Sequence, residues 1–188
     1  MKQYYFLICS LPYIKLAETP LISIGEFRTL CKGQVSEKDM QLLDAVSLLP
    51  VKDSPFSSSS AISQWQVRDK TLRQRMAAYR TALKSEKSGR SAPKTDLLSE
   101  IDRGIREAYT KPNPAEREKA LDSIRWQWLD ELELGHYFDI NKLFIYKLRL
   151  LIHDKWLRRN NETGYGNFEL IVNIINSRTL VCDETKVN

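Results

Sequence analysis

The chain has little glycine and no long hydrophobic run. Its 188 residues include only 7 glycines, which leaves little material for phosphate-cradling loops, and neither a GxxxxGK(S/T) nor a GxGxxG pattern occurs. The longest apolar runs, residues 4–9 and 143–146, are far shorter than the ~20 residues that a membrane-spanning helix requires. We therefore expect neither a nucleotide-binding loop nor a transmembrane helix.

Cysteine and histidine are also scarce. The chain has three cysteines, Cys9, Cys31 and Cys182. Their odd number and the lack of CxxC spacing favour reduced thiols in the cytoplasm over a disulfide framework. His136 and His153 have no cysteine nearby, whereas a zinc site needs three or four converging ligands. No serine or cysteine lies in a recognised nucleophile context. The sequence thus predicts no metal, no cofactor and no catalytic residue, and we expect a protein that is not an enzyme.

Acidic residues gather near position 130. Asp130, Glu131 and Glu133 lie on a predicted helix that also carries Arg125. Paired carboxylates of this kind are able to act as acid and base, but the neighbouring arginine favours a simpler interpretation. We expect a solvated helix face on which arginine pairs with acids.

Positive charge is concentrated in one segment. The chain carries 29 Lys and Arg against 24 Asp and Glu, a net charge of +5, yet residues 65–94 alone hold nine cations and two acids. A long helix is predicted there, with the basic side chains on the faces outside one apolar seam. The seam residues recur at intervals of 7, 4, 3 and 4, and they are Trp65, Leu72, Met76, Tyr79 and Leu83.

Three interpretations of the basic helix at residues 65–94 are open. Its charged face is solvated, or it docks on an acidic protein or an anionic lipid surface, or it neutralises nucleic-acid phosphates. Nucleic acid is disfavoured as a partner, because the aromatic residues lie on the apolar seam and not among the cations, where bases would stack. The candidate partner-binding residues are Arg68, Arg73, Arg75, Arg80 and Lys84.

Helical periodicity runs through most of the chain, and sustained strand alternation is nearly absent. Short connections between helices indicate antiparallel neighbours, so we predict an all-α fold, an antiparallel helical bundle in two helical halves. An N-terminal half at 1–84 includes the basic helix, and a polar linker follows at 85–95. A C-terminal half then covers 96–177, and a polar tail covers 178–188.

Capping residues mark several predicted helix starts. Asp139 is expected to cap a helix by accepting an amide one turn further on, with Phe138 packed beneath it as a staple and Asn141 in the same motif. We interpret these three residues as structural, and a direct contact role for Asp139 and Asn141 is the alternative. The other predicted N-caps are Ser23, Ser36 and Asn113.

The order of these motifs resembles a known family. The matching residues are Tyr4 to Leu7, Ser10-Leu11-Pro12, Glu26-Phe27, Trp65, Leu72, Tyr79-Arg80, Asn113-Pro114, Glu118, Leu121, Arg125-Trp126, Leu129, His136 to Asn141, Tyr146-Lys147-Leu148, Trp156 and Gly164. Together they resemble a bacterial family of unassigned function that is encoded with the genes of V-type ATPases. That family in turn is similar to a reduced form of the C-type subunit of V-type ATPases (the d-type subunit in eukaryotes), an all-helical funnel between the rotor stalk and the membrane ring. We call this relative the funnel subunit.

The resemblance implies a non-catalytic component of a V-type ATPase or ATP synthase that is similar to the funnel subunit and couples the central rotor stalk to the membrane ring in proton or other ion transport. Its expected partners are the subunits of the central stalk and the membrane ring, with an anionic membrane surface as a further contact. Its expected location is cytoplasmic and peripheral, at the inner face of the membrane. Two alternatives stay open: a transient assembly factor or adaptor of that complex, and a nucleic-acid-binding helical protein that uses residues 65–94.

Overall fold

The structure is a computed structural model that describes residues 3–49, 55–57, 60–87, 100–159, 164 and 166–174. Every regular element in these ranges is a helix, and no strand occurs among them. The predicted all-α class is confirmed for this part of the chain, while the antiparallel bundle stays a prediction. The helices are α1 (Tyr5–Ser10), α2 (Ile24–Cys31), α3 (Glu37–Ala45), α4 (Ala61–Lys87), α5 (Glu100–Thr110), α6 (Pro114–Glu133) and α7 (Ile140–Leu157).

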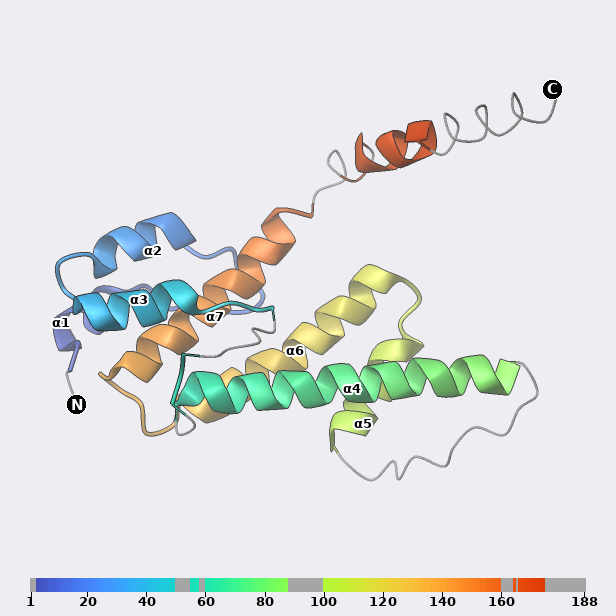
Figure 1. The fold of residues 1–188 in the computed structure, drawn as a ribbon, viewed down its shortest axis with the longest axis horizontal. Coiled ribbons are helices and arrows are strands. Elements are labelled where there is room, and N and C mark those ends of the chain that lie inside the picture. The colour runs from blue at the N-terminus through green and yellow to red at the C-terminus, as the bar shows by residue number, and fades with distance from the viewer. Residues whose placement is uncertain are drawn as a thin grey trace, which may run out of the picture. The chain divides into compact units, whose positions relative to one another are not determined.

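The chain divides into two compact units, residues 1–152 and residues 153–188. In the first unit, α4 packs against α5 and α6 (Figure 1). The helices on either side of the linker predicted at 85–95 therefore belong to the same unit. Of that linker, residues 88–95 lie outside the described residues, and so does the tail predicted at 178–188.

The predicted N-caps are confirmed in the first unit. Ser23 forms a full capping box with Glu26, because its hydroxyl accepts the Glu26 amide and the Glu26 carboxylate accepts the Ser23 amide. Ser36 accepts an amide hydrogen bond at the start of α3, and Asn113 accepts one at the start of α6. Local sequence signals therefore account for where α2, α3 and α6 begin.

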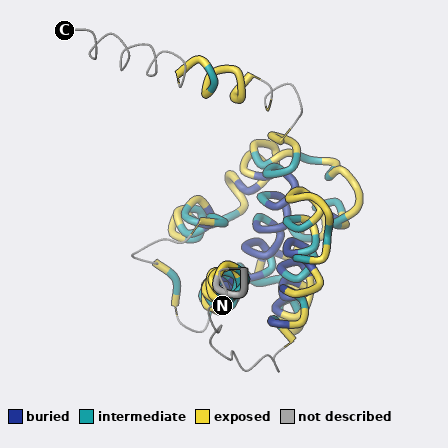
Figure 2. The backbone as a smooth tube through the Cα atoms, turned by 90° about the vertical axis from the view of Figure 1, so that its right-hand side faces the viewer, coloured by how far each residue is buried: buried dark blue, intermediate teal, exposed yellow. Residues whose placement is uncertain are grey.

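One hydrophobic core of the first unit lies between α4, α5 and α6. The apolar seam predicted on α4 faces this core, since Leu72 is fully buried and Met76 and Tyr79 pack against the cluster. Figure 2 shows the buried positions along the inner sides of the helices. The buried members of the cluster come from all three helices, and they are Leu72, Ile105, Ala108, Leu121 and Trp128.

The N-terminal elements pack against α7. Phe27 of α2 stacks on Tyr146, with 5.2 Å between the ring centroids, and the Tyr146 hydroxyl donates to the carbonyl oxygen of Pro12 at 2.9 Å. Lys147 Nζ donates to the carbonyl oxygen of Leu43, near the end of α3, at 2.6 Å. Burial raises the pKa of Tyr146 to about 12 and lowers the pKa of Lys147. Specific polar contacts thus fix the N-terminal segment and α3 on α7.

The second unit contains the last turns of α7 and a helix over residues 166–174. Lys155 Nζ and Arg159 Cζ lie over the ring of Trp156, 5.3 Å and 5.2 Å from its centroid. These cation–π contacts hold two basic side chains against an aromatic surface. Several apolar side chains of the helix at 166–174 are exposed, namely Phe168, Leu170, Ile171 and Ile174.

Candidate interaction surfaces

Two of the candidate cations hold α4 to its neighbours. Arg68 Nη1 lies 2.5 Å from the carboxylate of Glu131 on α6. Arg75 Nη1 lies 3.7 Å from the buried carboxylate of Asp102 on α5. Both arginines therefore have an acidic partner within the protein, on the side of α4 that faces α5 and α6.

Arg73 has two partners within the protein. Its Nε lies 2.5 Å from the carboxylate of Asp69, one turn earlier, and its Nη2 donates to the carbonyl oxygen of Leu48 at 3.1 Å. Arg80 and Lys84 are both exposed, and the described residues supply no acidic partner for either side chain. Among the five candidates, these two therefore keep their charge at the surface, and a role in partner binding stays a prediction for all five.

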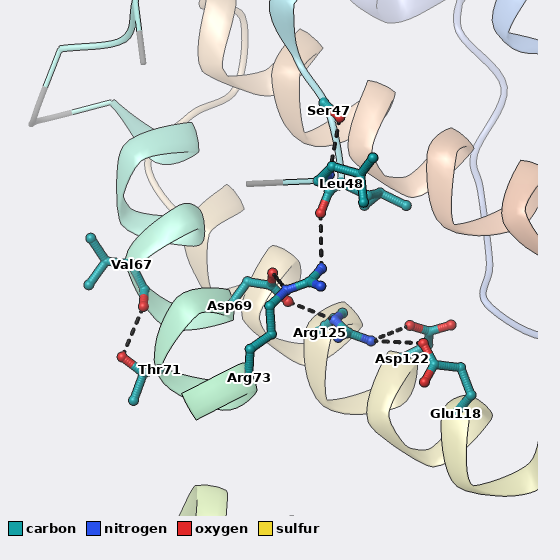
Figure 3. A network of polar contacts seen from close by, with 10 residues as sticks. Ser47, Leu48, Val67, Asp69, Thr71, Arg73, Glu118, Asp122 and Arg125 are labelled. Carbon is teal, nitrogen blue, oxygen red and sulfur yellow. Dashed lines mark hydrogen bonds and ion pairs between the residues drawn. The ribbon is translucent and has the colours of Figure 1, made fainter. Parts of the chain in front are cut away.

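Arg125 of α6 is the centre of a buried ionic cluster (Figure 3). Its Nε donates to Asp69 of α4 at 2.9 Å, and its Nη1 lies 2.8 Å from Asp122 and 3.5 Å from Glu118. Arg125 is 6% exposed. Burial alone would lower the pKa of Arg125, but the hydrogen bonds and charges of Asp69 and Asp122 outweigh burial and raise it. Arg125 therefore stays a cation and binds α4 to α6.

This cluster corrects the sequence-based interpretation of Arg125. The sequence places Arg125 on a solvated face beside the acids of residues 130–133, and the structure shows that this is wrong. Arg125 is buried against α4 because the carboxylate of Asp69 lies on the facing side of that helix. The expectation that arginine pairs with acids is correct, but the partners are Asp122 and Glu118 earlier on the same helix and Asp69 from a distant part of the chain.

Arg149 of α7 forms a second ionic cluster with α6. Its Nη2 lies 2.5 Å from Asp130 and 2.7 Å from Glu133, and Lys142 also pairs with Glu133. Burial alone would raise the pKa of Glu133, but the hydrogen bonds from Arg149 and Lys142 outweigh burial and lower it. The contact between α6 and α7 therefore depends on an ionised carboxylate.

We predict that Glu133 contributes to acid sensitivity. Its pKa in the folded chain is lower than the ordinary value of 4.5, so its contribution to the free energy of unfolding is present above pH 4.5 and is lost as the pH falls through the lowered pKa. Glu133→Gln removes this titration, and its stability should therefore change less with pH than that of the parent chain. Urea denaturation between about pH 7 and about pH 3 measures the difference, and identical pH profiles would contradict the assignment.

The motif at the start of α7 is organised around the Asp139 carboxylate. This carboxylate accepts the Lys142 amide at 3.3 Å, which is an N-cap contact, and it accepts Asn141 Nδ2 at 3.1 Å. His136 Nδ1 lies 2.7 Å from the same carboxylate. Asp139 thus joins the loop after α6 to the first turn of α7.

Asn141 and Phe138 extend this motif to other parts of the chain. Asn141 is 5% exposed, and its Oδ1 accepts the backbone amide of Ala61, the first residue of α4, at 3.1 Å. The carbonyl oxygen of Phe138 accepts the Tyr4 amide at 2.6 Å, and its ring centroid lies 4.7 Å from that of Tyr5. The motif therefore connects the beginnings of α1, α4 and α7.

We predict unequal losses of stability for Asp139→Ala and Asn141→Ala. Asp139→Ala removes an N-cap acceptor at a half-buried position and should lower the free energy of unfolding by about 1 kcal/mol. Asn141→Ala leaves the buried amide of Ala61 without its acceptor and should lower it by about 1–3 kcal/mol. Chemical denaturation of both variants provides the comparison, and a larger loss for Asp139→Ala would count against this account of the motif.

Two concave surfaces among the described residues of the first unit differ in character. A hollow of about 290 Å³ beside α4 is lined by the apolar side chains of Leu48, Trp65 and Val67, by the cations Lys70 and Arg73 and by the carboxylate of Asp69. A groove of about 720 Å³ between α5 and α6 is lined by charged side chains of both signs and by uncharged ones. The hollow therefore combines apolar surface with the cation Lys70, since Arg73 pairs with Asp69.

The described residues contain neither a metal-binding group nor a membrane-spanning helix. No set of three or more side chains able to hold a metal ion occurs in this part of the chain. Within the same ranges, no helix has both the length and the apolar character that crossing a membrane requires.

Comparison with known proteins identifies a family that the chain matches. The family model described as "Protein of unknown function (DUF2764)" matches residues 1–51 and 60–179. No curated protein and no solved structure matches the chain. The matched residues include α4 and the motif at the start of α7.

Proposed function

We propose that this chain, which belongs to the DUF2764 family, is a non-catalytic component of a V-type ATPase or ATP synthase, similar to the funnel subunit. The description of the family assigns no function. In this role it couples the central rotor stalk to the membrane ring, so that torque passes between ATP turnover and ion movement. It acts as a peripheral protein at the cytoplasmic face of the membrane, with stalk and ring subunits as its partners.

The observation that carries the proposal is the motif Phe138-Asp139-Ile140-Asn141, which resembles a helix start of the funnel subunit. In this chain the motif holds the beginnings of α1 and α4 to α7 through buried or half-buried hydrogen bonds. A protein that couples rotor to ring has to transmit force without large internal movement. Satisfied polar contacts between distant segments favour that stiffness.

The two ionic clusters support the same role. Arg125 binds α4 to α6, and Arg149 binds α6 to α7. Both arginines are less than a tenth exposed, so salt screens their ion pairs much less than pairs at the surface. These clusters hold α4, α6 and α7 together, which a protein that transmits torque requires.

Co-purification tests the proposal. A tagged full chain, isolated from solubilised membranes of cells that contain a V-type ATPase, should bring down stalk and ring subunits. A tagged Asp139→Ala chain is the matched variant, and it should retain these subunits because Asp139 acts as a helix cap. Recovery of no V-type ATPase protein by the parent chain would overturn the proposal. Recovery of incomplete sub-assemblies alone would assign the chain to the transient assembly factors instead.

Nucleic-acid binding by α4 is the competing function. Arg68, Arg73 and Arg75 already pair with acids of this protein, which leaves fewer cations for phosphates. Retardation of DNA or RNA that falls steeply with rising salt would support this alternative over the proposed role. Absence of retardation at low salt would exclude it.

A further inference from the structure

α4 carries an uncharged line of side chains on the side away from the core. These residues are spaced alternately four and three positions apart, which places them along one line of an α-helix. They are exposed or half-buried, in contrast to the seam that contains Leu72 on the opposite side. We call this line the outer stripe, and it consists of Val67, Thr71, Gln74, Ala78 and Thr81.

The outer stripe is suited to close contact with another helix. Thr71 Oγ1 donates to the carbonyl oxygen of Val67 at 2.9 Å (Figure 3), and Thr81 Oγ1 donates to that of Ala77 at 3.0 Å. Because both hydroxyls are satisfied within α4, neither needs water or a polar partner. Val67 is 62% exposed, so an apolar side chain is available at the start of the stripe.

Cations border one flank of the outer stripe. Lys70 and Lys84 lie two heptads apart, at positions that flank a helix–helix seam, and Arg80 lies on the same flank. In the stretch between Lys70 and Lys84 there is no acidic residue. The described part of the chain provides no ion pair for any of these three cations. Within the described residues, this flank therefore presents positive charge that no acidic side chain pairs with.

The hollow lies at the N-terminal end of this surface. Val67 of the outer stripe and Lys70 of its flank both line the hollow, together with Leu48 from the segment after α3. An apolar side chain entering the hollow would be positioned beside the cationic flank. An apolar hollow and the positive charge of Lys70 thus lie side by side on α4.

We propose that the outer stripe, its cationic flank and the hollow form a binding site for an acidic amphipathic helix of a partner protein. The partner places one large apolar side chain in the hollow and aligns its acidic side chains with Lys70, Arg80 and Lys84. Contact from Val67 to Lys84 spans about 26 Å at ~1.5 Å per residue, which a partner helix of about 18 residues covers. This inference deepens the proposed function by naming the partner's chemistry, and it rests on that function for the partner's identity.

A protein helix fits this surface better than a lipid or nucleic-acid partner does. A lipid surface would be contacted by several large apolar side chains, whereas Val67 is the one large apolar residue of the outer stripe. Single-stranded nucleic acid would require exposed aromatic rings among the cations, but Trp65 is 2% exposed and Tyr79 packs on the core. Charge complementarity along a narrow line is typical of paired helices.

Fluorescence anisotropy with a designed peptide tests the inference. The probe is a labelled synthetic helix with leucine along its heptad seam and glutamate on both flanks, titrated with the purified full chain. The parent chain should bind it, and Lys70→Glu/Lys84→Glu should weaken binding at least tenfold. The matched control is Lys32→Glu/Lys38→Glu, which makes the same charge change at exposed positions outside α4 and should weaken binding less than twofold.

Val67→Glu tests the apolar part of the site. It should also weaken peptide binding at least tenfold, while circular dichroism shows a folded chain, since glutamate is a better helix former than valine. Equal loss in the two double variants, or no binding by the parent chain, would overturn the inference. Binding to phosphatidylcholine–phosphatidylglycerol vesicles that depends on Lys70 and Lys84, without peptide binding, would overturn it in favour of lipid. The assay contains no protein of a V-type ATPase, so its failure is distinct from failure of co-purification.

Discussion

Arg125→Met should lower the free energy of unfolding by about 3–5 kcal/mol, because the substitution removes the buried cation that binds the carboxylates of Asp69 and Asp122. Asp69 and Asp122 are 4% and 1% exposed, and both bind the Arg125 guanidinium. Methionine fills a similar volume, so the loss comes mainly from the ion pairs that Arg125 makes with these carboxylates. Urea denaturation followed by circular dichroism measures this loss.

Two further variants separate charge from packing in this experiment. Arg68→Met removes an arginine whose ion pair with Glu131 is largely exposed, and it should lower stability by less than about 1 kcal/mol. Combining Arg125→Met with Asp69→Asn and Asp122→Asn removes the buried charges together and should restore much of the stability lost in Arg125→Met. A triple variant less stable than Arg125→Met alone would contradict the account of this cluster.

Leu72→Ala should lower the free energy of unfolding by about 2–5 kcal/mol. Leu72 is 0% exposed and belongs to the cluster that α4 forms with α5 and α6, so alanine leaves a cavity among three helices. Leu72→Met conserves the side-chain volume and should cost less than about 1.5 kcal/mol. Thermal or chemical denaturation provides the comparison. Similar losses for the two variants would show that the site collapses or is less closely packed than the structure indicates.

The sequence predicted those parts of the fold that depend on neighbouring residues. The capping box of Ser23 and Glu26 involves positions three apart, and its hydrogen bonds form wherever the helix is placed. The apolar seam of α4 was predictable for a similar reason, because Leu72 and Met76 are brought to one face by helix geometry alone. Such signals indicate where a helix starts and which of its faces is buried. They do not indicate which other helices pack against that face.

Contacts between distant residues were beyond the sequence. Arg125 and Asp69 are 56 positions apart, and Asn141 and Ala61 are 80 apart. An acid one turn away, such as Asp122, is a partner that the sequence allows, but only the packing of α4 on α6 brings Asp69 to Arg125. The candidate site follows the same rule: the cations of α4 were evident, but the hollow requires Leu48 from another segment.

The hydrogen bond from the Ala61 amide to Asn141 has a consequence for amide hydrogen exchange. Amides in the first turn of a helix lack intrahelical acceptors and normally exchange quickly with solvent. The Ala61 amide is held by a side chain of α7 and its residue is 1% exposed, so it should exchange slowly. Deuterium uptake at this one amide therefore reports whether the start of α4 separates from α7, in the isolated chain or in an assembly.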